Sequence, residues 1–95
     1  MKSLKGKIVF ITGATSGIGK ACAYAFAKEG ANIIINARRL ELLNEIADDI
    51  RKKYDVKVYS FKLDVRNREE VFNSINSLPE EWKKIDILVN NAGLA

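Results

Sequence analysis

The sequence contains no histidine, one cysteine and one proline in 95 residues. Without histidine, this stretch has neither histidine-based acid–base catalysis nor the usual zinc sites. The single cysteine, Cys22, cannot form an internal disulfide, which agrees with a reducing compartment. No apolar run approaches the roughly 18 residues that span a bilayer, and the first residues lack the apolar core and cleavage site of a signal peptide. We therefore expect a cytoplasmic protein with no membrane segment.

Basic residues outnumber acidic ones only slightly, at 16 against 12, which gives a net charge of +4. They are scattered along the chain and form no basic run, so we expect no nucleic-acid partner. With 47% hydrophobic and 29% charged residues, the composition is typical of a soluble globular protein. A chain of 95 residues has room for one small domain.

Short apolar runs alternate with amphipathic stretches along the chain. The apolar runs are rich in β-branched residues and too short for helices, which is typical of buried parallel strands. Such strands are predicted at residues 7–12, 32–36, 56–63 and 85–90. Between them, apolar side chains recur at helical spacing. The predicted buried helix faces consist of Ala21, Cys22, Ala25 and Phe26 in residues 18–29, of Leu43, Ile46, Ala47 and Ile50 in residues 40–53, and of Val71, Phe72, Ile75 and Leu78 farther on.

The predicted helix boundaries carry their own signals. Gly30 follows the first helix, as a residue just past a helix C-terminus often does. Asn67 and Glu70 form a typical N-cap pair, and Pro79 suits the first turn of a short helix that reaches Trp82. The alternation predicts parallel pairing through right-handed crossovers. The expected fold class is therefore α/β, with a Rossmann-type doubly wound parallel sheet of strand order 3-2-1-4 and helices on both faces.

A glycine-rich segment, TGATSGIG at residues 12–19, lies where the first strand turns into the first helix. Gly13 lets the chain leave the strand, Gly17 lets backbone approach a pyrophosphate, and Gly19 allows close packing. Free amides of the first helical turn and the helix dipole can then hold phosphates. The alternative is a plain glycine-rich turn with a serine helix cap. The predicted cofactor contacts in this segment are Gly13, Ala14, Thr15, Ser16, Gly17, Ile18 and Gly19.

Two arginines follow the second predicted strand. In NAD-binding domains of this kind, an acidic residue about 20 positions beyond the glycines bonds the ribose hydroxyls. Here Ala37 occupies that place, and Arg38 and Arg39 follow it. A guanidinium forks onto phosphate oxygens, whereas a carboxylate would repel them. We therefore expect NADP as the cofactor, with its 2′-phosphate on these arginines; the alternative is two solvated arginines at a helix start.

The octet at residues 12–19, together with NNAG at residues 90–93, resembles the signature of the short-chain dehydrogenase/reductase family. The resemblance implies that Asp64 accepts from the adenine amino group and that the Val65 backbone contacts the ring edge. Asp64 could instead cap the next helix, although Asn67 could do that too. The resemblance also implies that Asn90 ties neighbouring strands together. It further implies that three residues pass under the ribose: Asn91, Ala92 and Gly93.

A narrower resemblance is to the branch of the family that oxidises serine and other 3-hydroxy acids with NADP. It lies in the segments LDVRNREEV at residues 63–71 and LPEEW at residues 78–82. It implies hydride transfer between NADP(H) and a small hydroxyl or carbonyl substrate, in a homo-oligomer. The family's catalytic Tyr-x-x-x-Lys is spelled by Tyr24 and Lys28, but on the helix after the glycine loop, where these side chains cannot reach the nicotinamide. We predict no catalytic residue within residues 1–95.

A sheet that stops at its fourth strand leaves apolar surface uncovered, so we expect residues 1–95 to be the NADP-binding half of a longer single-domain enzyme. Two other functions stay open. One is a dinucleotide-binding module without catalysis, such as a redox sensor or an excised cofactor-binding half. The other is an interaction protein that uses the exposed sheet edge.

Overall fold

The computed structural model describes residues 3–15, 17–64 and 66–91. Strands and helices alternate along the chain, as the hydrophobic pattern predicts. The elements are β1 (Ile8–Ile11), α1 (Gly17–Lys28), β2 (Asn32–Ala37), α2 (Leu40–Lys53), β3 (Val58–Lys62), α3 (Arg68–Asn76), the 3₁₀ turn η1 (Glu80–Trp82) and β4 (Ile87–Val89).

The four strands form one parallel sheet in the order β3-β2-β1-β4, which confirms the predicted topology. In the register, Phe10 of β1 lies opposite Ile34 of β2 and Leu88 of β4. Ile34 in turn lies opposite Tyr59 of β3. Strands β3 and β4 are shorter than the predicted ranges 56–63 and 85–90, although Lys57, Leu63 and Asp86 beside them still bond to the neighbouring strands. All four carboxyl ends therefore meet at one edge of the sheet.

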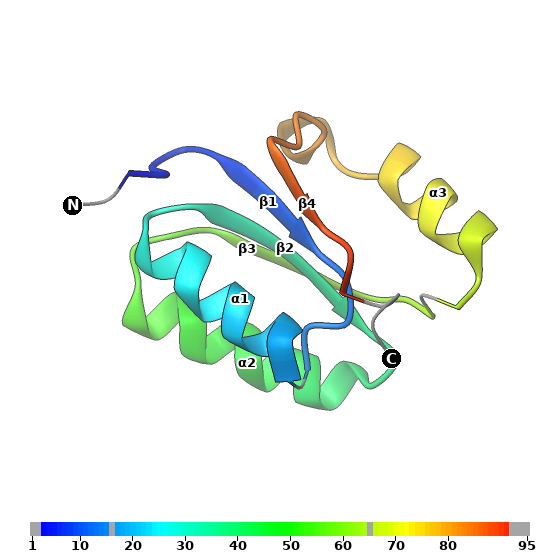
Figure 1. The fold of residues 1–95 in the computed structure, drawn as a ribbon, viewed down its shortest axis with the longest axis horizontal. Coiled ribbons are helices and arrows are strands. Elements are labelled where there is room, and N and C mark those ends of the chain that lie inside the picture. Colours follow the sequence, from blue (N-terminus) through cyan, green and yellow to red (C-terminus); the bar gives the residue numbers. More distant parts are fainter. Residues whose placement is uncertain (1–2, 16, 65, 92–95) are drawn as a thin grey trace.

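Helices cover both faces of the sheet (Figure 1). Helices α1 and α2 lie on one face, and α3 with η1 lies on the other. The first face holds the larger core, where Val9 and Ile11 of β1 join Ile33 and Ile35 of β2. From α2 the predicted stripe enters this core in full: Leu43, Ile46, Ala47 and Ile50 are buried. The second face holds a smaller core of Ile8, Phe10, Ile34, Leu78 and Trp82.

Helix α1 faces the sheet with its smallest residues. Gly19, Ala23 and Ala27 are buried, whereas Ala21 and Ala25 are exposed, so the predicted face was wrong for these two alanines. An alanine-rich helix is apolar on most sides, and its periodicity does not single out one face. The i, i+4 row of small side chains faces the sheet because it permits close approach. No helix in the described ranges is long and apolar enough to cross a bilayer.

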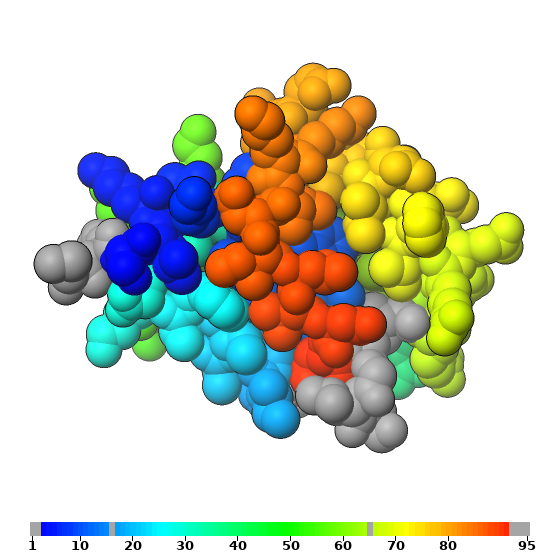
Figure 2. Space-filling view, turned by 45° about the horizontal axis from the view of Figure 1, so that its top comes forward, coloured from blue at the N-terminus to red at the C-terminus, as the bar shows by residue number. Residues whose placement is uncertain are grey.

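The layer that α3 provides is thin. None of its nine residues is buried, and Phe72, which we predicted to face the core, is 72% exposed. Leu88 of β4 lies on the same face of the sheet as Phe10 and is 56% exposed. Figure 2 shows the segment that leads into β4, in orange and red, at the molecular surface beside α3. Among the described residues, two large apolar side chains on this face of the sheet are therefore exposed.

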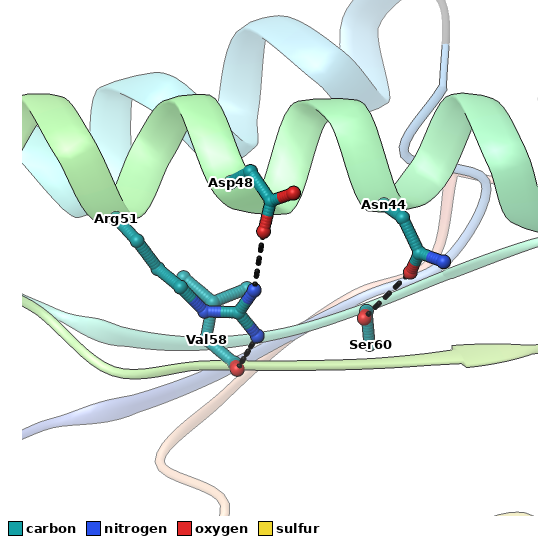
Figure 3. Close-up of polar contacts among 5 residues, drawn as sticks. All are labelled: Asn44, Asp48, Arg51, Val58 and Ser60. Atoms are coloured by element: carbon teal, nitrogen blue, oxygen red, sulfur yellow. Dashed lines mark hydrogen bonds and ion pairs between the residues drawn. The ribbon is translucent and has the colours of Figure 1, made fainter.

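Polar contacts fasten α2 to the edge strand β3 (Figure 3). The Arg51 guanidinium donates to the Val58 carbonyl oxygen at 2.6 Å and pairs with Asp48 at 3.0 Å. One turn earlier, the Ser60 hydroxyl donates to Asn44 Oδ1 at 3.4 Å. These contacts fix α2 against β3 between Asn44 and Arg51, and they leave the start of α2 at the carboxyl edge of the sheet.

Candidate functional site

The glycine-rich segment forms the connection between β1 and α1 at the carboxyl edge of the sheet. Gly13 and Gly17 adopt φ angles of +64° and +58°, in the left-handed region where residues with a Cβ are strained. A Cβ on Gly17 would meet no atom of the described residues within 4 Å, so this turn faces open space. Ile18 beside it is 61% exposed. Gly17 and Ile18, at the start of α1, are therefore accessible to a ligand.

Gly19 serves close packing within the protein itself. It is buried in the first turn of α1, and a Cβ there would overlap the carbonyl oxygen of Gly13. The same Cβ would lie 2.7 Å from Asn91 Nδ2. The absence of a side chain lets the helix start directly against the loop, which brings the amides of its first turn to the edge of the sheet.

The strand-side half of the loop is tied to β2. The Ala14 amide donates to the Asn36 carbonyl oxygen at 3.0 Å, and the Gly13 amide donates to Asn36 Oδ1 at 3.4 Å. Ala14 is completely buried in the larger core, so its amide and side chain are both engaged. This geometry does not support the predicted cofactor contact by Ala14. Thr15 is only partly buried, so its side chain can still reach a ligand.

The other side of the loop is tied to the end of β4. The Asn91 amide donates to Thr12 Oγ1 at 2.9 Å, and Asn91 Nδ2 donates to the Gly13 carbonyl oxygen at 3.1 Å. Thr12 Oγ1 also lies 3.3 Å from Asn90 Oδ1, to which it can donate. Asn90 thus links β4 to β1, as the family resemblance implies. Asn91, which we expected under the ribose, holds the loop in shape.

Arg38 and Arg39 lie at the start of α2, and both side chains are exposed. Arg39 is the N-cap residue of α2 and makes no side-chain capping bond. Placing two cations at a helix N-terminus is electrostatically unfavourable unless an anion lies between them. The unsatisfied amides of the helix start would bind the same anion. Ala37 is buried in the core, so its side chain borders no open space.

Asp64 follows β3 at the same edge of the sheet. Arg66 donates to its carboxylate from Nε, from Nη2 and from the backbone amide, each at 3.1 Å. The side-chain and backbone bonds from Arg66, with a smaller effect of the Arg38 charge, lower the pKa of Asp64 to about 2. Asp64 is therefore ionised at neutral pH. The helix cap is Asn67, whose Oδ1 accepts from the Glu70 amide at 3.2 Å.

Four of the predicted contact residues lie outside the described residues: Ser16, Val65, Ala92 and Gly93. The sequence analysis also missed two residues at this edge, Asn36 and Arg66. A polar residue after three consecutive isoleucines was a signal for Asn36. For Arg66 the signal was its position two residues after Asp64, where an aspartate side chain often accepts from the backbone.

Tyr24 and Lys28 spell the catalytic motif on α1, and the contacts that Tyr24 makes are structural. The Tyr24 hydroxyl donates to Asp49 Oδ2 of α2 at 2.5 Å, and the ammonium of Lys53 lies 3.3 Å from the same oxygen. Burial and the bond to Asp49 raise the pKa of Tyr24 to about 12. A tyrosine that acts as a base near neutral pH needs a lowered pKa. Lys28 is exposed at the end of α1. The geometry supports a tie between two helices.

A parallel Rossmann-type sheet with a glycine loop and a basic helix start at its carboxyl edge defines a dinucleotide-binding protein. A family model described as "short chain dehydrogenase" matches residues 7–95, and the chain belongs to this family. It is 47% identical, over 96 aligned positions, to the NADP-dependent 3-hydroxy acid dehydrogenase of Schizosaccharomyces pombe, covering 100% of this chain and 37% of that protein.

Solved structures agree with this assignment. The L-sorbose reductase of Gluconobacter frateurii, complexed with NADPH and L-sorbose, superposes with a TM-score of 0.86 at 43% identity, covering 95% of this chain and 34% of that one. The serine dehydrogenase of Escherichia coli superposes with a TM-score of 0.78 at 43% identity, covering 88% and 37%. The chain thus spans 34–37% of the length of these relatives.

Proposed function

We propose that this chain is the NADP-binding part of an oxidoreductase that transfers a hydride between NADP(H) and a small hydroxyl or carbonyl compound. The observation that carries the proposal is the pair of exposed arginines at the start of α2, beside the ionised Asp64 and at the same sheet edge as the glycine loop. The arginines would hold the 2′-phosphate of NADP, which NAD lacks.

The described residues fit the rest of the cofactor as well. The open space at Gly17 and the first turn of α1 suit the pyrophosphate, since free amides and the helix dipole favour an anion there. Gly13, Thr15, Ile18 and Gly19 would line or shape this site. Asp64 would accept from the adenine amino group, with Val65 beside it. When bound, NADP supplies the hydride-transfer chemistry, and the protein contributes binding and orientation.

The names of the relatives support a proposal for the substrate class. The relative from Schizosaccharomyces pombe is named for 3-hydroxy acids, and the Escherichia coli structure for serine. We therefore favour a 3-hydroxy acid such as serine, with a ketose as the alternative that the sorbose reductase suggests. From the family resemblance we also propose a cytoplasmic homo-oligomer. In such an enzyme, residues 1–95 would form the cofactor-binding part of one longer domain.

The test is an assay of the complete protein that carries this segment. We expect NADP-dependent oxidation of L-serine or another 3-hydroxy acid, followed by the absorbance of NADPH. The matched control is the same assay with NAD. NADP binding without turnover on any hydroxy acid or polyol would favour a dinucleotide-binding module. No NADP binding would refute the proposal.

A further inference from the structure

The two carboxylate oxygens of Asp64 accept different numbers of hydrogen bonds. An ionised carboxylate offers about two lone-pair positions on each oxygen. Oδ1 accepts from both the amide and Nε of Arg66, which fills it. Oδ2 accepts only from Nη2 of Arg66 among the described residues. One acceptor position on Oδ2 is therefore left, at the edge of the sheet where the proposed nucleotide lies.

The fork between Arg66 and Asp64 contributes little to the fold. The two residues are two positions apart, so the ion pair connects no separate elements. The Arg66 side chain is 73% exposed and that of Asp64 is 35% exposed, and pairs of this kind add little to stability. The pair does, however, set the orientation of the carboxylate. Two parallel bonds from one planar guanidinium allow a single plane for the acceptor.

We propose that Arg66 is a positioning residue for adenine recognition: its guanidinium holds the Asp64 carboxylate so that Oδ2 accepts from the exocyclic amino group of the base. This inference rests on the proposed NADP-binding function and assigns Arg66 a role distinct from that of Arg38 and Arg39. Those two distinguish NADP from NAD by its phosphate. Arg66 acts on the adenine, which both dinucleotides contain.

The two roles predict different patterns of loss. Arg66→Ala frees the Asp64 side chain, and fixing it again on binding costs affinity. We expect the Kd for NADP and the Kd for NAD to rise by the same factor, roughly 2- to 10-fold. Arg66→Lys keeps the charge but cannot fork across both oxygens, so it should lose nearly as much.

The decisive probe is the hypoxanthine analogue of NADP, in which an oxo group replaces the amino group. The complete protein should bind NADP more tightly than this analogue, because the oxo group offers Asp64 no donor. In Arg66→Ala the ratio of the Kd for the analogue to the Kd for NADP should fall towards 1. A freely rotating carboxylate accepts poorly from the amino group. A residue that merely maintains the fold would weaken both ligands equally and leave the ratio unchanged.

The other outcomes are equally specific. An unchanged preference in Arg66→Ala, or full affinity in Arg66→Lys, would overturn the positioning role while leaving the proposed function intact. A loss confined to NADP would assign Arg66 to the 2′-phosphate and also overturn it. If the parent protein binds no NADP at all, the proposed function fails first and this inference fails with it.

Discussion

The side-chain amide of Asn91 donates to the carbonyl oxygen of Gly13 at 3.1 Å, across 78 positions of sequence. Asn91→Ala would leave that carbonyl without this donor. We expect a loss of about 1–2 kcal/mol in the free energy of unfolding, measured with urea, and weaker binding of NADP as the loop loosens. Asn73→Ala, on the exposed face of α3, is the matched control and should change neither. Equal effects of the two substitutions would assign Asn91 no particular role.

Two glycines of the loop should respond differently to alanine. At Gly17 an added Cβ meets open space, so Gly17→Ala costs only the left-handed strain of about 1–2 kcal/mol while obstructing the pyrophosphate. At Gly19 the Cβ overlaps the Gly13 carbonyl, and the helix must move. We expect Gly19→Ala to destabilise the fold more than Gly17→Ala does, in urea unfolding at equal concentration. A reversed order would show that the loop packs differently.

Arg38 should determine the choice between the two dinucleotides. Removing one charge-assisted contact with Arg38→Leu costs about 1.5–3 kcal/mol, hence roughly 10- to 150-fold in the Kd for NADP, with little change for NAD. Lys7→Leu removes one charge at the opposite edge of the sheet and serves as the control. Calorimetric titrations with both cofactors measure the effect. Equal loss for NADP and NAD would place Arg38 away from the phosphate.

To invert the preference for NADP over NAD, a carboxylate has to replace an exposed side chain near the proposed 2′-phosphate site. Ala37→Asp with Arg38→Leu suggests itself from the sequence, but Ala37 is buried in the core, where an aspartate would lose its hydration. Arg38→Asp places the repulsive charge at an exposed position instead. We expect Arg38→Asp to prefer NAD and to stay folded, whereas the double variant loses stability. Thermal unfolding beside the titrations separates these two effects.

The bond between Tyr24 and Asp49 should make stability depend on pH at both extremes. The pKa of Tyr24 is raised from 10.0 to about 12, so its contribution is complete below about pH 10 and is lost between about pH 10 and 12. The pKa of Asp49 is lowered, by the bonds from Tyr24 and Lys53, so its share is lost as the pH falls below 3.8 and through the folded value.

Tyr24→Phe should therefore lower the free energy of unfolding by about 1–2 kcal/mol at neutral pH. The difference from the parent should vanish near pH 12, where the parent has lost the bond as well. Urea unfolding at the two pH values measures it. NADP binding should be unchanged. If Tyr24→Phe abolished turnover of the complete protein without lowering its stability, Tyr24 would have a catalytic role, contrary to our prediction.

The sequence predicted well what periodicity and spacing determine. The strand order and the buried face of α2 follow from the alternation of short apolar runs with a strongly amphipathic stretch. It failed where several faces were equally apolar, as for Ala21 on α1, and where an apolar residue had no layer to meet, as for Phe72 on α3. Periodicity shows that a helix has an apolar side, but packing partners decide whether that side is buried.

For the candidate site as well, features with a local sequence signal could be predicted, and features that depend on packing could not. The glycines and the arginine pair have local signals, because a turn or a charge pattern requires those residue types. The contacts of Asn36 with the loop and the fork of Arg66 on Asp64 depend on how separate segments meet in space. Burial of Ala14 and Ala37 had no signal, since alanine suits a core and a ligand site equally well.

The tie between Gly13 and Asn91 also has a consequence for synthesis on the ribosome. The loop that would receive the nucleotide is translated early, but the residue that fixes its shape emerges 78 positions later. Until β4 has been translated and has paired with β1, the loop of the nascent chain has its contacts with Asn36 but lacks those with Asn91. The loop of a growing chain therefore reaches its full set of hydrogen bonds only once the fourth strand is in place.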